Sequence, residues 1–137
     1  MTKYDITMME TAILWSKMSH CKRSRVGCAI AKDSRIISIG YNGTPSGFMN
    51  HCEEDDTTLH SVLHAEQNAL MFAAKSGIST DNTTLYCTLS PCAQCSLLII
   101  QSGITRVVYA NTYRNSDGLD LLRQANIEVI HLPMVNL

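Results

Sequence analysis

The residues best suited to chemistry lie between positions 64 and 95. Here a His-Ala-Glu triplet at 64–66 is followed, after a gap, by Pro-Cys-Ala-Gln-Cys at 91–95. One imidazole and two thiolates can bind zinc and leave the fourth tetrahedral position open, which distinguishes a catalytic zinc site from a closed structural one. The sequence therefore predicts His64, Cys92 and Cys95 as metal ligands. Glu66 lies close to them and is the predicted acid–base.

Both halves of this pattern are typical of helix N-termini. Apolar residues recur at helical spacing after Glu66 and end near Lys75, and Pro91 suits the first turn of a helix because no N–H is needed there. Cys92 and Cys95 are three residues apart, so one helical turn places both sulfurs on the same side. The partial positive charge of a helix N-terminus favours thiolate over thiol. Two helix N-termini are thus expected to converge on the metal.

A closed structural zinc site is the alternative from a different class, a non-enzymatic zinc-stabilised module. Such a site needs a fourth protein ligand, and the sequence contains no second Cys-x-x-Cys pair to supply it. In that module Glu66 would be dispensable. The pairing of Cys-x-x-Cys with His-x-Glu and a preceding proline favours the catalytic site.

Composition excludes several other classes of protein. The 137 residues suffice for one domain with a real core, and we expect a single domain over residues 1–137. A net charge of -1 gives no general attraction to nucleic acid, and no apolar run reaches membrane-spanning length. The first residues lack the apolar region of a signal peptide. We therefore expect a cytoplasmic protein (in the host cytoplasm if viral) whose cysteines are metal ligands or free thiols, with Cys28 and Cys87 as buried fillers.

Periodicity predicts the elements that must position these residues. We expect helices at about 4–19, from about 61 to 75, through 97–103 and at 117–125, and strands at 26–30, 35–40, 85–89, 106–110 and 127–132. The first helix should bury an apolar stripe of Ile6, Met9, Ile13, Trp15 and Met18. A hairpin followed by alternating helices and strands predicts an α/β fold with a mixed five-stranded sheet, helices on both faces, and zinc at the strand ends.

Residues 41–61 show neither helical nor strand periodicity. Structureless loops of this length are uncommon in compact domains and are often functional. We expect function in the first half, because the glycines of residues 40–47 suit close approach of the backbone to a ligand. We expect the acidic second half, residues 53–56, to be a solvated surface.

These stretches resemble the cytidine deaminase superfamily, and more closely the deoxycytidylate (dCMP) deaminases of the phage and cellular type. The resemblance runs over nearly the whole chain, from Ser24 to Ile127. The motifs at 64–66 and 91–95 are typical of the superfamily. The glycine-rich loop at 40–47 is typical of dCMP deaminases, and residues 108–109 and 112–113 resemble their final active-site strand and loop.

The resemblance implies a cytidine deaminase-like three-layer α/β/α fold and a homohexamer that converts dCMP to dUMP for thymidylate synthesis. It also implies activation by dCTP and inhibition by dTTP, with Mg²⁺ accompanying the effector. By motif position, the substrate-binding residues are Ser24, Arg25, Asn42, Ala65, Ser90, Tyr109 and Tyr113. The effector-binding residues are Gly40, Asn42, Gly43, Thr44, Pro45 and Gly47, with Lys75 coupling sites across subunits.

A basic cluster before the first strand offers a phosphate contact. Arginine suits this role because its planar fork makes two charge-assisted hydrogen bonds. We expect Arg25 to hold the substrate phosphate, with the Ser24 hydroxyl beside it, because both abut the strand start. We expect Lys22 and Arg23 to be solvated surface charges.

Some relatives carry a second, structural zinc. In this sequence Cys21 and Cys52 fall at plausible positions, with His20, His51 or His60 as partners. Ordinary thiols at both cysteines are the alternative.

Two related enzymes are the nearest rivals. A free cytidine deaminase normally has cysteine as its first ligand and lacks the glycine-rich loop. A tRNA adenosine deaminase shares both zinc motifs but should be basic, whereas the net charge here is -1. A small nucleotide substrate is therefore favoured, with no nucleic-acid or membrane partner.

Overall fold

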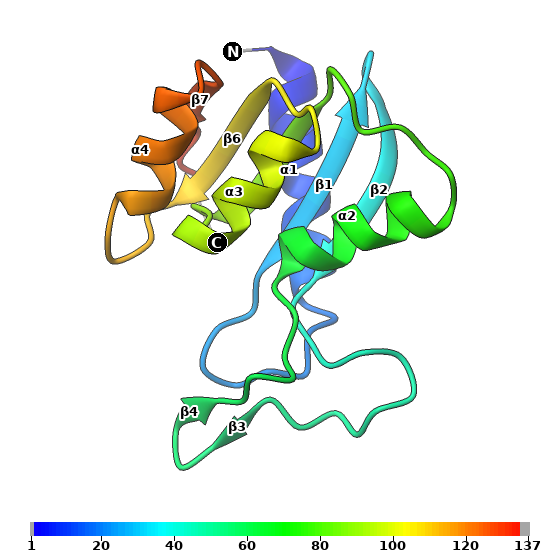
Figure 1. The fold of residues 1–137 in the computed structure, drawn as a ribbon, viewed down its shortest axis with the longest axis vertical. Coiled ribbons are helices and arrows are strands. Elements are labelled where there is room, and N and C mark those ends of the chain that lie inside the picture. The colour runs from blue at the N-terminus through cyan, green and yellow to red at the C-terminus, as the bar shows by residue number, and fades with distance from the viewer. Residues whose placement is uncertain (1, 135–137) are drawn as a thin grey trace.

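One mixed β-sheet runs through the centre of the molecule, whose structure is a computed structural model that describes residues 2–134 (Figure 1). Its strands are β1 (Gly27–Lys32), β2 (Arg35–Tyr41), β5 (Thr84–Leu89), β6 (Arg106–Asn111) and β7 (Glu128–His131), in the order β2-β1-β5-β6-β7. Strand β1 pairs antiparallel with both β2 and β5, whereas β5, β6 and β7 are parallel. The mixed five-stranded sheet predicted from the sequence is confirmed.

Helices cover both faces of this sheet. Helix α1 (Lys3–Ser16) packs on one face, and α2 (Ala65–Lys75), α3 (Ala93–Gln101) and α4 (Asp117–Gln124) pack on the other (Figure 1). Alternate residues of a strand point to opposite faces. Tyr86 and Val108 accordingly contact the α1 layer, while Cys87 and Val107 contact the α2–α4 layer. The expected three-layer α/β/α fold is confirmed.

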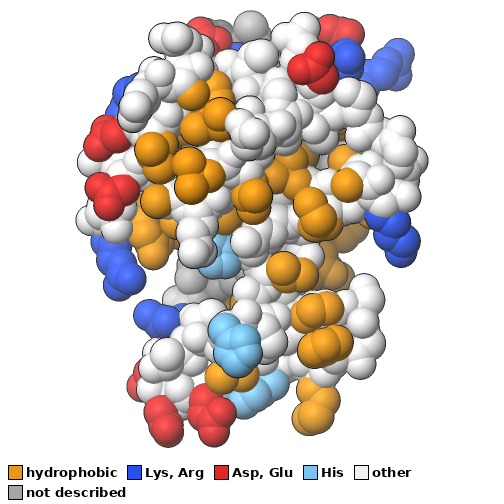
Figure 2. Space-filling view, in the orientation of Figure 1, with side chains coloured by type: hydrophobic (Ala, Val, Ile, Leu, Met, Phe, Trp, Pro, Cys, Tyr) orange, Lys and Arg blue, Asp and Glu red, His pale blue; other side chains and the backbone are white. Residues whose placement is uncertain are grey.

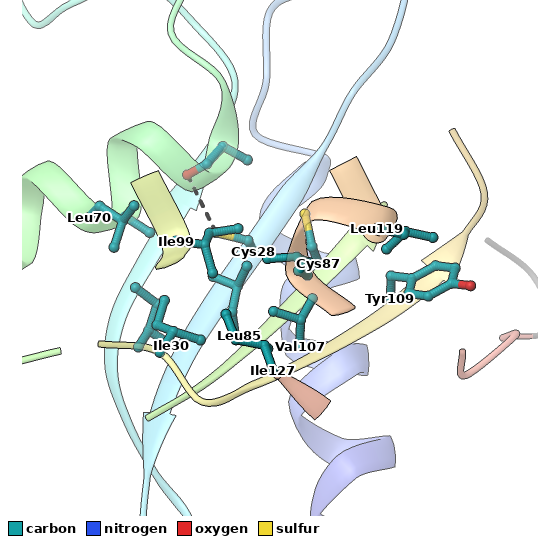
Figure 3. Packing of buried hydrophobic residues seen from close by; sticks show 14 residues of the cluster. Cys28, Ile30, Leu70, Leu85, Cys87, Ile99, Val107, Tyr109, Leu119 and Ile127 are labelled. Carbon is teal, nitrogen blue, oxygen red and sulfur yellow. Dashed lines mark hydrogen bonds between the residues drawn. The ribbon is translucent and has the colours of Figure 1, made fainter. Parts of the chain in front are cut away.

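The larger core cluster lies between the sheet and α2, α3 and α4 (Figure 3). The thiols of Cys28 and Cys87 are free and fully buried in this cluster, as the sequence predicted. Cys28 donates its S–H to the carbonyl oxygen of Ala65 at 3.4 Å, so β1 is tied to the first turn of α2. The core thus fixes the end of α2 that follows His64.

Helix α1 turns a different face to the core from the one its apolar pattern predicted. Met9 is fully buried and Ile13 is partly buried, as expected. Ile6, Trp15 and Met18, however, are exposed, and the helix ends at residue 16 rather than 19.

Close packing explains this choice of face. A Cβ atom at Gly27 would collide with the backbone of Ala12 and Ser16, so small residues let α1 lie directly against β1. Asp5 is also buried, because its carboxylate accepts hydrogen bonds from the guanidinium of Arg106 at 2.7 and 2.9 Å.

Within residues 2–134 no helix is both long and apolar enough to cross a membrane.

Residues 17–26 and 42–63 form a lobe that projects beyond one end of the sheet, at the bottom of Figure 1. This lobe contains the short hairpin β3 (Glu53–Glu54) and β4 (Thr57–Thr58). The intervening Asp55 and Asp56 both have positive φ, 51° and 60°, as the tightest hairpin turns require. Figure 2 shows acidic side chains at the hairpin tip with histidines beside them. The acidic run is therefore an ordered hairpin with an exposed tip, not an unstructured loop.

The lobe is held together by cross-links between its two segments. Cys21 and Cys52 form a disulfide, which corrects the expectation that the cysteines outside the metal site are free thiols. The carboxylate of Glu53 accepts hydrogen bonds from the backbone N–H groups of Lys22 and Arg23, at 2.9 and 3.0 Å. Residues 20–23 and 52–53 therefore move as one unit.

Candidate active site

His64, Cys92 and Cys95 come together at the sheet ends where α2 and α3 begin. Nδ1 of His64 lies 3.2 Å from Sγ of Cys95 and 3.6 Å from Sγ of Cys92. The three donor atoms all lie within 4.8 Å of one another. An imidazole nitrogen and two sulfurs facing a common point form the donor set that a catalytic zinc prefers.

Helix starts place these three side chains. His64 is the N-cap of α2 and Cys92 is the N-cap of α3, while Cys95 lies in the first turn of α3. The N–H of His64 donates to the side-chain oxygen of Gln67 at 2.8 Å, which fixes the entry into α2. Both turns that carry the candidate ligands therefore lie at helix N-termini, as the sequence motif predicted.

Two glycines allow the neighbouring elements to press against these turns. A Cβ at Gly40 on β2 would collide with the carbonyl of Ala65, and a Cβ at Gly118 on α4 would collide with the backbone of Pro91 and Cys92. Gly118 is a supporting residue that the sequence analysis missed, because its role depends on α4 crossing the Cys92 turn.

Cys92, Cys95 and His64 shift one another's pKa through their mutual contacts. A hydrogen bond from the Cys95 thiol is the largest effect on the Cys92 thiol, whose pKa is lowered to about 4. The same hydrogen bond, together with burial, raises the pKa of Cys95, and the contact with Cys92 raises the pKa of His64. A divalent cation would displace the proton from Cys95, since metal binding competes with protons for the same lone pairs.

Glu66 lies beside the three ligands on the first turn of α2. Its side chain is only 4% exposed, yet it lines the same cavity as His64 and Cys92. Burial raises the pKa of this carboxyl above its usual range. A carboxyl group that holds a proton more readily than usual can both accept and donate one during a reaction.

The cavity next to these residues has a volume of about 480 Å³, which lies in the range of small-molecule sites. His64, Glu66 and Cys92 form its metal end. Its other walls come from the lobe and from the loop after β6. The lobe, rather than the sheet, therefore completes the enclosure.

Five of the seven expected substrate-binding residues line this cavity, namely Ser24, Asn42, Ala65, Ser90 and Tyr113. The side-chain amide of Asn42 accepts a hydrogen bond from the N–H of Val26 at 2.9 Å and donates one to the carbonyl of Ser24 at 2.8 Å. The hydroxyl of Ser90 accepts from the N–H of Tyr113 at 2.6 Å. These bonds hold the cavity walls in place.

The other two expected residues, Arg25 and Tyr109, are not among the residues that line this cavity. The guanidinium of Arg25 donates to the carbonyl of Cys21 at 3.2 Å and lies outside the cavity wall. Tyr109 is 7% exposed and its ring stacks on His131 with the centroids 4.8 Å apart, so it belongs to the core. Its position on β6 points it between the sheet and the helices rather than into the cavity.

Two arginines that were not expected there lie on the wall instead. Arg23, predicted to be a solvated charge, lines the cavity, and so does Arg114 in the loop after β6. A basic cluster at 22–25 signalled an arginine contact but not which member makes it. Arg114 directly follows the Thr112-Tyr113 pair, and that adjacency is the signal that could have identified it.

The expected effector loop packs beside the start of α2. Gly43 exchanges backbone hydrogen bonds with Leu63 at 3.0 and 2.8 Å, and Gly47 has a positive φ of 90°. Lys75 lies at the far end of the 11-residue helix α2, which spans about 16 Å at a rise of ~1.5 Å per residue. Lys75 therefore lies at the opposite end of α2 from the part of this loop that contacts Leu63.

The expected second zinc site does not fit the arrangement in the lobe. Cys21 and Cys52 are joined as a disulfide, so neither offers a thiolate. Cys21, Cys52 and Glu53 form a cluster whose possible ligand atoms lie within 4.8 Å of one another, whereas His60 is not part of this cluster. The disulfide takes the place of the metal as the link between the two segments.

Comparisons with known proteins add an independent line of evidence. The chain matches the family described as "Cytidine and deoxycytidylate deaminase zinc-binding region" over residues 2–111. It is 36% identical to the deoxycytidylate deaminase of Enterobacteria phage T4, over 96% of this chain and 91% of the phage protein. It is 39% identical to the deoxycytidylate deaminase of Saccharomyces cerevisiae, over 92% of this chain but 44% of the yeast protein.

A solved structure is similar over nearly the same extent. It is that of the dCMP deaminase from the cyanophage S-TIM5 in complex with dCMP and dUMP. The two folds agree with a TM-score of 0.93 at 47% identity, over 96% of this chain and 99% of the cyanophage chain.

Proposed function

The chain belongs to the cytidine and deoxycytidylate deaminase family, and from that premise we propose that it hydrolyses dCMP to dUMP and ammonia with a bound zinc ion. Family membership makes the chain a deaminase, whereas its substrate and its use of zinc are our proposal. One observation carries it: His64, Cys92 and Cys95 face a common point beside the buried Glu66, at the end of a nucleotide-sized cavity.

The residues present fit a zinc ion of the catalytic kind. His64, Cys92 and Cys95 would hold it, and within the described residues no fourth His, Cys, Asp or Glu joins their cluster. When bound, the metal supplies Lewis-acid activation of a water molecule.

Glu66 would move the protons of the reaction. It would take a proton from the attacking water and deliver it to N3 of cytosine. It would then take the proton of the hydroxyl added at C4 and deliver it to the departing amine, so that ammonia leaves as the C4 carbonyl forms. Its burial supports this role, because a raised carboxyl pKa makes the carboxylate a better base toward the attacking water. One group serving both steps explains why a single buried carboxylate lies at the metal end of the cavity.

The substrate assignment is supported by the relatives and by the shape of the site. The T4 and yeast proteins are deoxycytidylate deaminases, and the cyanophage structure holds dCMP and dUMP. Asn42, Ser90 and Tyr113 present polar and aromatic groups along the cavity between the metal end and the lobe. These groups suit a base and sugar whose reacting carbon points toward Glu66.

A nucleotide panel tests this proposal directly. Zinc-loaded protein should release ammonia from dCMP, with dUMP formed in equal amount. Deoxycytidine, cytidine and AMP serve as competing substrates. Equal rates on dCMP and deoxycytidine would contradict the substrate, and no release from any cytosine compound would contradict the activity.

We further propose regulation by dCTP as activator and dTTP as inhibitor, with Mg²⁺ on the triphosphate, at residues 40–47. The proximity of this loop to the active site supports it, because Asn42 lies in the loop and also lines the cavity. Gly47, with its positive φ of 90°, permits the kind of turn in which successive backbone N–H groups can bind phosphate. A dCMP saturation curve that neither triphosphate alters would contradict regulation.

A homohexamer is the assembly that we propose. Its support is the exposed apolar surface over α2 and α3, which is in view in Figure 2. Met71, Phe72, Leu97 and Leu98 are each at least 42% exposed there. Monomers seldom expose a contiguous apolar patch of large side chains. Sedimentation at micromolar concentration tests the assembly, and a monomeric mass would contradict it.

A further inference from the structure

The Cys21–Cys52 disulfide lies between two cavities. Cys21 lines the active-site cavity, whereas Cys52 lines a second cavity of about 290 Å³ in the lobe. Glu53, the residue after Cys52, lines both, so the two cavities are neighbours. Both half-cystines are buried from bulk solvent, and a small reagent in the second cavity would therefore meet Cys52.

The bond joins two segments that each form part of the active-site wall. Residues that line the cavity follow each cysteine closely, namely Arg23, Ser24 and Val26 after Cys21, and Glu53, Thr58 and Val62 after Cys52. Strands β1 and β2 lie between the two cysteines in the chain and are held by their own pairing in the sheet. The disulfide therefore controls how the two wall segments meet rather than whether the sheet forms.

Hydrogen bonds also link these segments, but they are exposed to solvent. The N–H groups of Lys22 and Arg23 donate to the carboxylate of Glu53, and Nη1 of Arg23 donates to the hydroxyl of Thr58 at 2.9 Å. Segments held by exposed hydrogen bonds open locally more readily than a packed core does. Breaking the disulfide should therefore lower the fraction of molecules in which the wall is formed.

Resting on the proposed deaminase function, we propose that the Cys21–Cys52 bond is a redox switch on substrate binding. The disulfide form holds the two wall segments together, and the dithiol form releases them. The metal end takes no part, because His64, Glu66 and Cys92 are placed by the starts of α2 and α3. Reduction therefore raises KM and leaves kcat unchanged.

The electrons for this switch come from a dithiol reductant. One of its thiolates attacks Sγ of Cys52, which breaks the protein S–S bond and releases Cys21 as a thiolate. The second thiolate of the reductant attacks the mixed disulfide, releases Cys52 as a thiolate and leaves the reductant oxidised to a disulfide. The two protons of the dithiol pass through solvent to the two cysteines. Two electrons and two protons thus move from the reductant to the protein.

The test measures kcat and KM on dCMP for the zinc-loaded wild type before and after treatment with dithiothreitol. Alkylation and mass spectrometry identify Cys21 and Cys52 as linked or free in each sample. KM should rise about 10-fold on reduction, the change expected if the wall is formed in about a tenth of the dithiol molecules, while kcat stays unchanged. Reoxidation with oxidised glutathione should restore the original KM.

The double variant Cys21→Ser, Cys52→Ser controls for other effects of the reductant. It has no bond to reduce, so its KM should match that of reduced wild type, and dithiothreitol should not change it. Removal of zinc by the reductant would lower kcat in the variant as much as in wild type. Cys28→Ala removes a buried thiol outside the lobe and should respond to dithiothreitol as wild type does.

Two results would overturn the switch. One is an equal KM for wild type with the bond present and with it broken. The other is that Cys21 and Cys52 stay free thiols after treatment with oxidised glutathione.

Amide exchange separates failure of the switch from failure of the proposed function. If wild type turns over no cytosine compound in either form, the proposed reaction fails. The switch then still predicts faster exchange at residues 23–26 and 58–62 in the dithiol form than in the disulfide form. Equal exchange in the two forms would overturn it.

Discussion

The metal end of the active site and the lobe that closes it are built by different means. At the metal end, His64 and Cys92 are N-caps of helices that pack on a buried sheet, and glycines at 40 and 118 allow close contact. In the lobe, a disulfide and side-chain hydrogen bonds from Glu53 and Asn42 do most of the cross-linking. Regular structure therefore positions the groups that we propose to react, whereas irregular structure positions those that we propose to recognise the substrate.

This difference implies that reaction and recognition can be damaged separately. A change at the metal end should abolish turnover of every substrate. A change in the lobe should alter the choice among substrates while the chemistry persists.

The largest effect is expected from Cys95→Ala. Loss of one of three protein ligands should remove most of the zinc, all measurable turnover and part of the stability, because metal binding contributes to folding. Zinc content by elemental analysis and ammonia release are the measurements. The buried thiol variant Cys28→Ala is the control and should keep its zinc. Full zinc occupancy in Cys95→Ala would rule out the ligand assignment.

A smaller effect on the sheet should follow Asp5→Asn. Asp5 is buried against Arg106 and also accepts a hydrogen bond from the hydroxyl of Tyr86 at 2.6 Å. Removing its charge leaves a largely buried guanidinium, which Glu128 partly satisfies at 3.1 Å. We expect the free energy of unfolding to fall by about 2–3 kcal/mol, measured by urea denaturation. Glu128→Gln, at an exposed carboxylate, should change it by less than about 1 kcal/mol.

The same pair predicts a pH dependence. Hydrogen bonding from Arg106 lowers the pKa of Asp5 below that of the unfolded chain, which is about 3.9. A lowered folded-state pKa gives stability that is present above the unfolded pKa and is lost as the pH falls below it. The difference in unfolding free energy between wild type and Asp5→Asn should therefore shrink from pH 5 to pH 2.5. A constant difference would show that the charge of Asp5 is not the cause.

The smallest effect on global stability is expected from Cys52→Ser. Opening a disulfide that spans 31 positions should cost about 2 kcal/mol or less, because the lobe projects from the sheet rather than lying within it. Amide exchange should accelerate at residues 20–25 and 52–58 while β5 and β6 stay protected. Reductant should have the same effect on wild type and none on the variant. Uniform acceleration would show that the lobe and the sheet unfold together.

The sequence was informative where a side chain's role is set by its near neighbours. The candidate metal ligands, Glu66 and the helix starts follow from residues a few positions apart, and the alternation of apolar residues in the sequence indicated the strands of the sheet. Cys28 and Cys87 were correctly placed in the core for the same reason.

The sequence was misleading where a role depends on distant partners. Asp5 is buried because Arg106 lies opposite it, and Ile6 and Trp15 are exposed because α1 packs through its small residues. The placement of Arg23 on the cavity wall depends on a hairpin about 30 positions away, held by Glu53. Such contacts leave no periodic signal in the chain.

The central claim is that Glu66 moves protons at a zinc held by His64, Cys92 and Cys95. The most direct test is to measure zinc content and dCMP turnover together for wild type and Glu66→Gln, a change that preserves the shape of the side chain. The account predicts equal zinc in both proteins and a drop in kcat of at least about 10²- to 10⁴-fold in the variant. Near-normal turnover by a zinc-loaded Glu66→Gln protein would contradict it.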